Sequence, residues 1–341
     1  MKQIFWIFIS FFIFSGAVLA QDNGLSLTTS PLPVNLVAEP GTAITTQLKV
    51  KNNGLEKETL TLGLMKFQAF GEEGKPKLLD REIGDDYFDW VSFSENDFEL
   101  APNEWKTITM TINVPAEAAF GYYYAVTFAR KDSSVTGLGT TKIVGATACL
   151  VLLEVRVQNA VRSIVVNDFL SSQKIYEFLP AKFFIRLKNR GNVHVVPRGN
   201  IFIDRGNDRD VGVLEINDVK GNVLPNSSRI FEASWNDGFP NYVEKKDGNK
   251  MLLDKKGNVK TELKWDLSQF SKFRWGKYTA NMLLIYDDGT RDVPIEAKVD
   301  FWVIPYRIIL VVLAILIPLV FGLWTIIGVI FRKVFGKKKD K

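Results

Sequence analysis

An unbroken run of 24 uncharged residues, Ile308–Phe331, constrains this chain of 341 residues more than any other feature. As a helix rising about 1.5 Å per residue, the run would span roughly 36 Å, which exceeds the ~30 Å hydrocarbon core of a bilayer. Trp302 and Tyr306 precede the run, where an aromatic belt forms, and Arg332 and Lys333 open a basic tail behind it. We therefore predict a transmembrane helix, with these four residues as its membrane anchor.

The N-terminus has the pattern of a secretory signal peptide. Lys2 is followed by the apolar run Ile4–Phe14 and by small residues that end at Ala20. We predict a signal peptide over residues 1–20, a transmembrane helix over 307–332 and a cytoplasmic basic tail over 333–341. The chain would then be a single-pass protein of the cell membrane, with everything between the two apolar segments outside the cytoplasm.

The charge of the chain is concentrated at its ends. The formal net charge is +5, but the part from residue 21 to 306 carries 35 basic residues against 37 acidic ones. The basic tail is explained by the membrane anchor, so the lipid bilayer is the expected partner and a nucleic acid is not. With one Cys and one His, an intramolecular disulfide and a multi-histidine metal site are excluded.

The exported part shows period-two alternation of apolar and polar residues, which is typical of strands with one buried face. The clearest runs are Ile44–Val50, Ile108–Val114, Phe183–Leu187 and Tyr278–Tyr286. Helical periodicity is nearly absent between residues 25 and 302. The sequence therefore predicts an all-β fold for the exported part.

The two halves of the exported part share three short signatures in the same order, which indicates an internal repeat. The paired segments are Leu48–Gly54 with Ile185–Gly191, Leu100–Asn103 with Leu224–Asn226, and Gly121–Ala125 with Gly276–Ala280. Asn and Gly at strand ends, and Pro before a strand, suit the crossings of an immunoglobulin-like β-sandwich. We predict two such sandwiches in tandem, over residues 25–158 and 160–303, with inserts near 66–98 and 238–270.

This order of segments resembles the WxL-interacting surface proteins of bacteria. In the second half, Leu187–Gly199 resembles a stretch of that family that contains Asn-x-Gly, and Asn222–Arg229 resembles another that contains Pro and Arg. The resemblance covers most of residues 30–335. It implies contact with peptidoglycan through the first sandwich and contact with a partner or host protein through the second. The chain shows no cell-wall sorting motif, and its N-terminal stretch before Gly41 is short for the family.

Catalytic motifs are absent from the sequence. No Ser or Cys lies in a nucleophile motif, and His194 and Cys149 lie in strand-like stretches where a structural role is expected. The first insert places acidic residues beside aromatic ones, a composition that suits a sugar or a peptide. The candidate ligand-binding residues are Phe70, Asp86, Tyr87, Phe88, Asp89 and Trp90, together with the neighbouring Asp85. The alternative is that this insert packs on its own sandwich.

Three polar segments offer no specific chemistry. Asp204–Asp210 and Asp287–Gly289 lack the spacing of a calcium loop and predict hairpin turns. Lys245–Lys260 predicts a solvated hairpin or loop, and the alternative for this segment is contact with anionic wall polymers. We expect no metal and no small-molecule cofactor. The predicted function is non-catalytic binding of a cell-wall polymer or of another surface protein. The alternative is a chaperone-like or assembly scaffold that uses sandwich edge strands, and the contrasting hypothesis is a wall-acting glycosidase.

Overall fold

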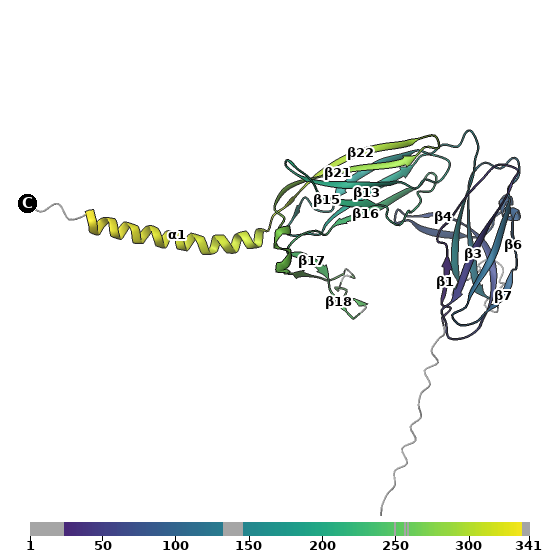
Figure 1. Ribbon diagram of the computed structural model, residues 1–341, viewed down its shortest axis with the longest axis horizontal. Helices are drawn as coiled ribbons and strands as arrows, with labels where there is room; N and C mark the ends of the chain where they lie inside the picture. Colours follow the sequence, from purple (N-terminus) through teal and green to yellow (C-terminus); the bar gives the residue numbers. More distant parts are fainter. Residues whose placement is uncertain (1–23, 132–145, 249, 256, 258, 336–341) are drawn as a thin grey trace, which may run out of the picture.

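The computed structural model describes residues 24–131, 146–248, 250–255, 257 and 259–335. It consists of a first β-sheet unit (residues 24–157), a second β-sheet unit (residues 164–303) and a long C-terminal helix that leads away from the second unit (Figure 1). The predicted signal peptide, residues 1–20, and the end of the basic tail, residues 336–341, lie outside the described residues.

The first unit has two facing sheets. The four-stranded sheet has the order β1 (Leu27–Ser30), β3 (Ala43–Asn52), β8 (Trp105–Asn113), β6 (Val91–Phe93). The six-stranded sheet has the order β2 (Val34–Ala38), β10 (Thr147–Val155), β9 (Phe120–Arg130), β4 (Glu58–Phe70), β5 (Lys75–Leu79), and β7 (Asp97–Leu100) also pairs with β4. A 3-10 helix, η1 (Asp86–Trp90), precedes β6.

The second unit also has two facing sheets. The three-stranded sheet has the order β11 (Ile164–Ser171), β13 (Ala181–Asn189), β16 (Ser228–Trp235). The five-stranded sheet has the order β12 (Ile175–Tyr176), β22 (Asp292–Val303), β21 (Gly276–Asp287), β14 (Arg198–Arg205), β15 (Asp208–Ile216). Between β16 and β21 lie the small pairs β17 (Asn241–Glu244) with β20 (Thr261–Lys264) and β18 (Lys246–Asp247) with β19 (Lys250–Met251), and the 3-10 helix η3 (Leu267–Lys272).

Each unit encloses its own hydrophobic core, and the alternation in the sequence explains which side chains enter it. Along β3, Leu48 and Val50 are buried while Lys49 between them is exposed, and along β13 the residues Phe183 and Ile185 are buried in the same way. The first core is built from strands of the first unit, and the second from strands of the second. The predicted, mostly β-sheet fold of residues 25–303 is confirmed.

The two units share a strand topology. In each, the first strand pairs antiparallel with one sheet (β1 with β3, β11 with β13), and the next segment pairs parallel with the last strand of the other sheet (β2 with β10, β12 with β22). The ladders place Phe120 opposite Val155 and Gly276 opposite Val303, so Phe120 corresponds to Gly276. The predicted pairing of Gly121 with Gly276 was therefore wrong by one residue. Both positions adopt a positive φ, 70° at Phe120 and 114° at Gly276. Glycine favours this conformation, so a phenylalanine at the first position hides the correspondence in the sequence.

The first shared signature has a clear structural reason. Asn52 donates to the carbonyls of Glu56 and Leu100 at 2.7 and 3.1 Å, and its side-chain oxygen accepts from the N–H of Gly54 at 2.8 Å. Asn189 repeats the set with Val193, Val223 and Gly191 at 2.8, 2.9 and 2.8 Å. Both asparagines are fully buried. Each one fixes the turn after its strand and ties this turn to the segment that leads into the neighbouring strand, Leu100 before β8 and Val223 before β16.

The helix α1 (Tyr306–Phe335) begins almost directly after β22. Among the described residues, its segment Tyr306–Arg332 is one helix that is long and apolar enough to cross a membrane, and none of it is buried in the protein. Pro318 lies inside the helix. Membrane-spanning helices tolerate an internal proline. Trp302 and Tyr306 are exposed at one end of this segment and Arg332 at the other, and Lys333 follows in the last turn.

Candidate functional site

The aromatic residues of the predicted ligand-binding insert turn inward. Tyr87 on η1 packs against Tyr122 and Tyr124 of β9, with ring centroids 5.4 and 5.3 Å apart, and Trp90 packs against Tyr122 at 4.7 Å. The hydroxyl of Tyr124 donates to the carbonyl of Tyr87 at 3.1 Å, and Phe88 is buried. Burial raises the pKa of Tyr87 to about 12. Tyr87, Phe88 and Trp90 therefore pack against the first unit instead of projecting into solvent.

The acidic residues of the insert lie on the outer side of η1. Asp89 accepts two hydrogen bonds from the guanidinium of Arg81, at 2.6 and 2.5 Å, and Asp85 accepts one from Lys66 at 2.8 Å. These hydrogen bonds hold the pKa values of both carboxyl groups below their usual range. A glycosidase needs one carboxyl group with a raised pKa as its acid. Asp86 is exposed beside them.

Phe70 does not join the other residues of the insert. Tyr124 pairs with Lys66 on β4, which places η1 near that residue. Phe70 lies four residues further along β4, roughly 14 Å away at about 3.4 Å per residue, and it is exposed at the tip of the β4–β5 hairpin. The structure therefore brings Tyr87, Phe88 and Trp90 together with Tyr122 and Tyr124, and leaves Phe70 apart.

His194 and Cys149 are both buried. The His194 ring packs edge-on against Tyr123 at 5.8 Å, and burial lowers its pKa to about 4. The Cys149 thiol donates to the carbonyl of Pro31 at 3.3 Å, and burial raises its pKa to about 12. A histidine held neutral by burial and a thiol held protonated match the structural roles expected from the sequence.

The predicted hairpin turns hold their carboxylates in internal hydrogen bonds. Asp204 accepts from Arg209 at 2.6 Å and from the N–H of Asp210 at 3.0 Å, and Asp288 accepts from Thr290 at 2.7 Å. Within the described ranges, no group of three or more His, Cys, Asp and Glu side chains is placed to hold a metal ion. Lys246–Asp247 and Lys250–Met251 form a hairpin, as expected for the lysine-rich segment.

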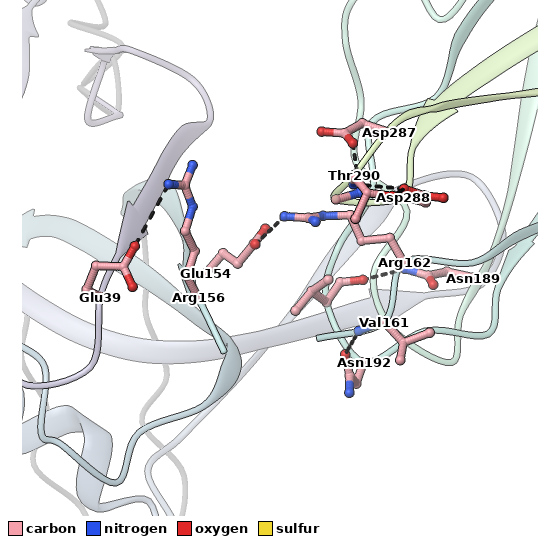
Figure 2. Close-up of polar contacts among 12 residues, drawn as sticks. Glu39, Glu154, Arg156, Val161, Arg162, Asn189, Asn192, Asp287, Asp288 and Thr290 are labelled. Atoms are coloured by element: carbon pink, nitrogen blue, oxygen red, sulfur yellow. Dashed lines mark hydrogen bonds and ion pairs between the residues drawn. The ribbon is translucent and has the colours of Figure 1, made fainter. Parts of the chain in front are cut away.

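The two units are joined by specific polar contacts. The carboxylate of Glu154 at the end of β10 pairs with Arg162, which reaches toward the Asp287–Thr290 turn (Figure 2). At the hairpin tip between β4 and β5, the carbonyl of Glu72 accepts from the N–H of Ile230 at 2.7 Å, and its carboxylate accepts from Arg186 at 3.0 Å. Because the hairpin tip reaches the edge of a sheet in the second unit, a cavity forms between the two units.

This cavity is a mostly apolar pocket of about 280 Å³. The first unit contributes the segment between β1 and β2, the β4–β5 hairpin and β10, and the second unit contributes the segment from Val219 to Arg229. Its apolar lining includes Leu32, Pro33, Phe67, Leu152 and Leu224. The sequence does not predict this pocket, because its lining residues lie nearly 200 positions apart. The one signal in the sequence is Arg229, the last residue of a stretch that resembles the WxL-interacting family.

Arg229 is the charged group of the pocket. Its guanidinium lies between two glycines, since a Cβ on Gly74 would lie 2.4 Å from Cζ and one on Gly221 would lie 2.5 Å from Nη2. It donates to the carbonyl of Asn222 at 2.9 Å and lies 5.1 Å from the ring centroid of Phe231. Burial lowers its pKa, and no carboxylate in the described part of the chain pairs with it. A half-buried cation without an anion is a site for a carboxylate or a similar anion.

The pocket lies at one end of the edge strand β16. Ile230 donates its N–H to Glu72, on the side of β16 that faces away from β13. Backbone groups alternate along a strand, so the N–H and C=O groups of Glu232 and Ser234 point to this same side. These two N–H groups meet no acceptor among the residues that the structure describes. In the first unit the corresponding strand β8 is covered by β6, which fills the fourth position of that sheet. The second unit has a three-stranded sheet, so no strand is hydrogen-bonded to β16 at this position, and β15 of the facing sheet packs beside it.

The edge of β22 differs from that of β16. The outward-facing backbone positions of β22 include Trp302, which donates to Lys174, and therefore also Pro294, Glu296 and Lys298. A proline without an N–H and a row of charged side chains are the usual protection of an edge strand against pairing. Of these two edges, β16 is the one suited to receive a strand.

No protein-family model and no curated protein matches this chain. Among solved structures, the class 5 fimbriae chaperone CfaA is 13% identical, with 80% of this chain and 98% of that chain covered and a TM-score of 0.37. A chaperone-tip adhesin complex of CFA/I fimbriae is 15% identical over 60% of this chain and 87% of that one, with a TM-score of 0.32. The Pseudomonas aeruginosa CupB2 chaperone is 9% identical over 81% and 100%, with a TM-score of 0.31. Because these scores are low, we base no inference on them, and the resemblance to WxL-interacting proteins stays a prediction.

Proposed function

We propose that this chain is a membrane-anchored, non-catalytic binding protein with two tandem immunoglobulin-like domains, and that it holds a segment of another exported polypeptide. The observation that carries the proposal is the open edge of β16, which leads into an apolar pocket with an unpaired arginine. This corresponds to the chaperone-like or assembly-scaffold alternative, and the edge of β16 with the pocket is its proposed site. Contact with a cell-wall polymer through η1 stays a separate prediction.

The anchor follows from the two ends of the chain. The signal peptide would direct export, and α1 would stop transfer with the basic tail in the cytoplasm. Both units would then lie outside the cytoplasm, where other exported chains pass as they fold. A chain that is still folding exposes strands whose backbone groups have no hydrogen-bond partner.

The bound segment would be extended and would add to the sheet beside β16. Its backbone would accept from the N–H groups of Glu232 and Ser234, and its side chains would alternate between the core side and solvent. In the first unit, a strand as short as β6 (Val91–Phe93) fills the corresponding position. A segment of a few residues is therefore enough to occupy the free edge.

The pocket sets the chemistry of the segment. A volume of about 280 Å³ lies just below the roughly 300–1,000 Å³ of small-molecule sites, so it suits one or two apolar side chains. Arg229 would pair with a carboxylate next to them, either an acidic side chain or a chain terminus. We therefore propose a partner segment with an apolar residue beside a carboxylate.

The test is photo-crosslinking in cells that make the full chain, with a photoreactive amino acid at Glu232 or, as a matched control, at Glu296 on the protected edge of β22. We expect an adduct of defined mass at position 232 and none at 296. The change Arg229→Gln should abolish the adduct, while Arg190→Gln, which alters an exposed arginine of the same unit, should preserve it. An adduct only at 296, or one indifferent to Arg229, contradicts the proposed site.

A further inference from the structure

We propose that the end of the second unit nearest α1 rests on the lipid bilayer, with Leu267 and Phe270 of η3 inserted among the lipid headgroups. This inference concerns a surface separate from the β16 pocket. It rests on the part of the proposed function that places α1 in a membrane.

The surface is unusually apolar for one exposed to water. Leu267 and Phe270 are 74% and 67% exposed, and Trp265 and Trp275 on either side are 55% and 58% exposed. Scattered apolar side chains are normal on a protein surface, but a group of large ones in one short segment marks a contact site. Trp275 directly precedes Gly276, which pairs with Val303 three residues before α1.

A continuous series of contacts links η3 to the start of α1. Phe270 and Trp265 both pack on Phe239, each with ring centroids 5.8 Å apart, and Trp265 also packs on Phe178 at 6.3 Å. Phe178 packs on Tyr242, whose hydroxyl donates to Glu177 at 3.1 Å. Glu177 in turn pairs with Arg307, the second residue of α1, at 3.4 Å. In Figure 1, the short green helix η3 lies at the end of the second unit from which α1 emerges.

The residue types around this surface suit a bilayer rather than a protein partner. Trp and Tyr concentrate at the headgroup level of membrane proteins, and Trp302 and Tyr306 already occupy that level beside α1. The segment from residue 244 to 275 carries nine basic against five acidic residues, which favours anionic headgroups. A surface that begins where a membrane helix begins is held against the bilayer by the anchor itself, so lipid is the occupant we infer.

The test uses the full chain in nanodiscs of phosphatidylcholine and phosphatidylglycerol that contain a nitroxide-labelled lipid. Single variants Leu267→Cys and Phe270→Cys carry an environment-sensitive fluorophore; the native Cys149 is buried, and the unaltered chain gives the labelling blank. Leu55→Cys, at an exposed position of the first unit, is the water-facing control. Leu316→Cys, in the middle of α1, is the lipid-facing control.

We expect a blue shift and strong quenching by the nitroxide lipid at positions 267 and 270, close to the values at 316 and far from those at 55. Quenching at 267 and 270 equal to that at 55, with 316 still quenched, overturns the inference while the anchor stands. Loss of quenching at 316 overturns the anchor and this inference together. If a protein covers the surface instead, a blue shift at 267 appears without quenching, and this result also overturns the inference.

Discussion

Replacing Asn189 by alanine should destabilise the second unit more than replacing Asn52 destabilises the first. The change strands two buried groups, the carbonyl of Val193 and the N–H of Gly191, while the carbonyl of Val223 still accepts from the N–H of Val195 at 3.1 Å. At about 1–3 kcal/mol for each buried group left without a partner, the loss for two groups is about 2–6 kcal/mol. In Asn52→Ala the carbonyl of Leu100 is equally buried, but Glu56 is exposed and Gly54 partly exposed, so water can replace those bonds and the loss is about 2 kcal/mol.

The assay is urea unfolding of the full chain in detergent, followed by tryptophan fluorescence, because Trp235 is a buried reporter of the second unit. Asn53→Ala is the matched control: its exposed side chain donates to Thr28 at 2.8 Å, and its loss should cost less than about 1 kcal/mol. The reasoning is refuted if Asn189→Ala costs no more than Asn53→Ala, or if the order of Asn52 and Asn189 is reversed.

Three further predictions concern burial and pairing. His194 has a pKa lowered from 6.5 to about 4. Between these pH values the unfolded chain binds a proton that the folded chain does not, so the free energy of unfolding should drop as the pH falls through this window. The drop, measured by urea unfolding, should be up to about 3 kcal/mol larger in the unaltered chain than in His194→Phe. Arg162→Ala should cost about 3 kcal/mol because it strands the buried carboxylate of Glu154, and a double change of both residues to Met should recover most of that loss; full stability of Arg162→Ala contradicts this. Tyr87→Ala should lower the free energy of unfolding by about 3 kcal/mol, whereas Asp86→Asn should leave it unchanged. If η1 contacts the cell wall, Asp86→Asn should weaken retention of the chain on insoluble peptidoglycan. Absence of retention for the unaltered chain contradicts that contact.

The sequence predicted the parts of this molecule that depend on local pattern. Alternation along β3 and β13 follows from one buried face per strand, and the shared Asn-x-Gly signature proved to be a pair of asparagines with the same hydrogen bonds. The long apolar run became α1. In each of these cases the physical cause lies within a few residues of its effect.

The features that sequence reasoning missed depend on contacts between distant segments. The pocket joins residues near 32, 70, 150 and 225, and no local pattern announces that they meet. Composition does not tell which way Tyr87 and Trp90 of η1 face, and in the structure both pack against tyrosine rings of β9. The open edge of β16 is visible only by comparison with β8, which a short strand covers.

Hydrogen exchange of two backbone amides tests the central claim most directly. The N–H groups of Glu232 and Ser234 should exchange rapidly in the free chain, while that of Phe231, which faces β13, should exchange slowly. In the complex isolated by crosslinking, the amides of Glu232 and Ser234 should become as slow as that of Phe231. Slow exchange of both amides in the free chain, or rapid exchange in the complex, contradicts the claim that β16 is a free edge filled by a partner strand.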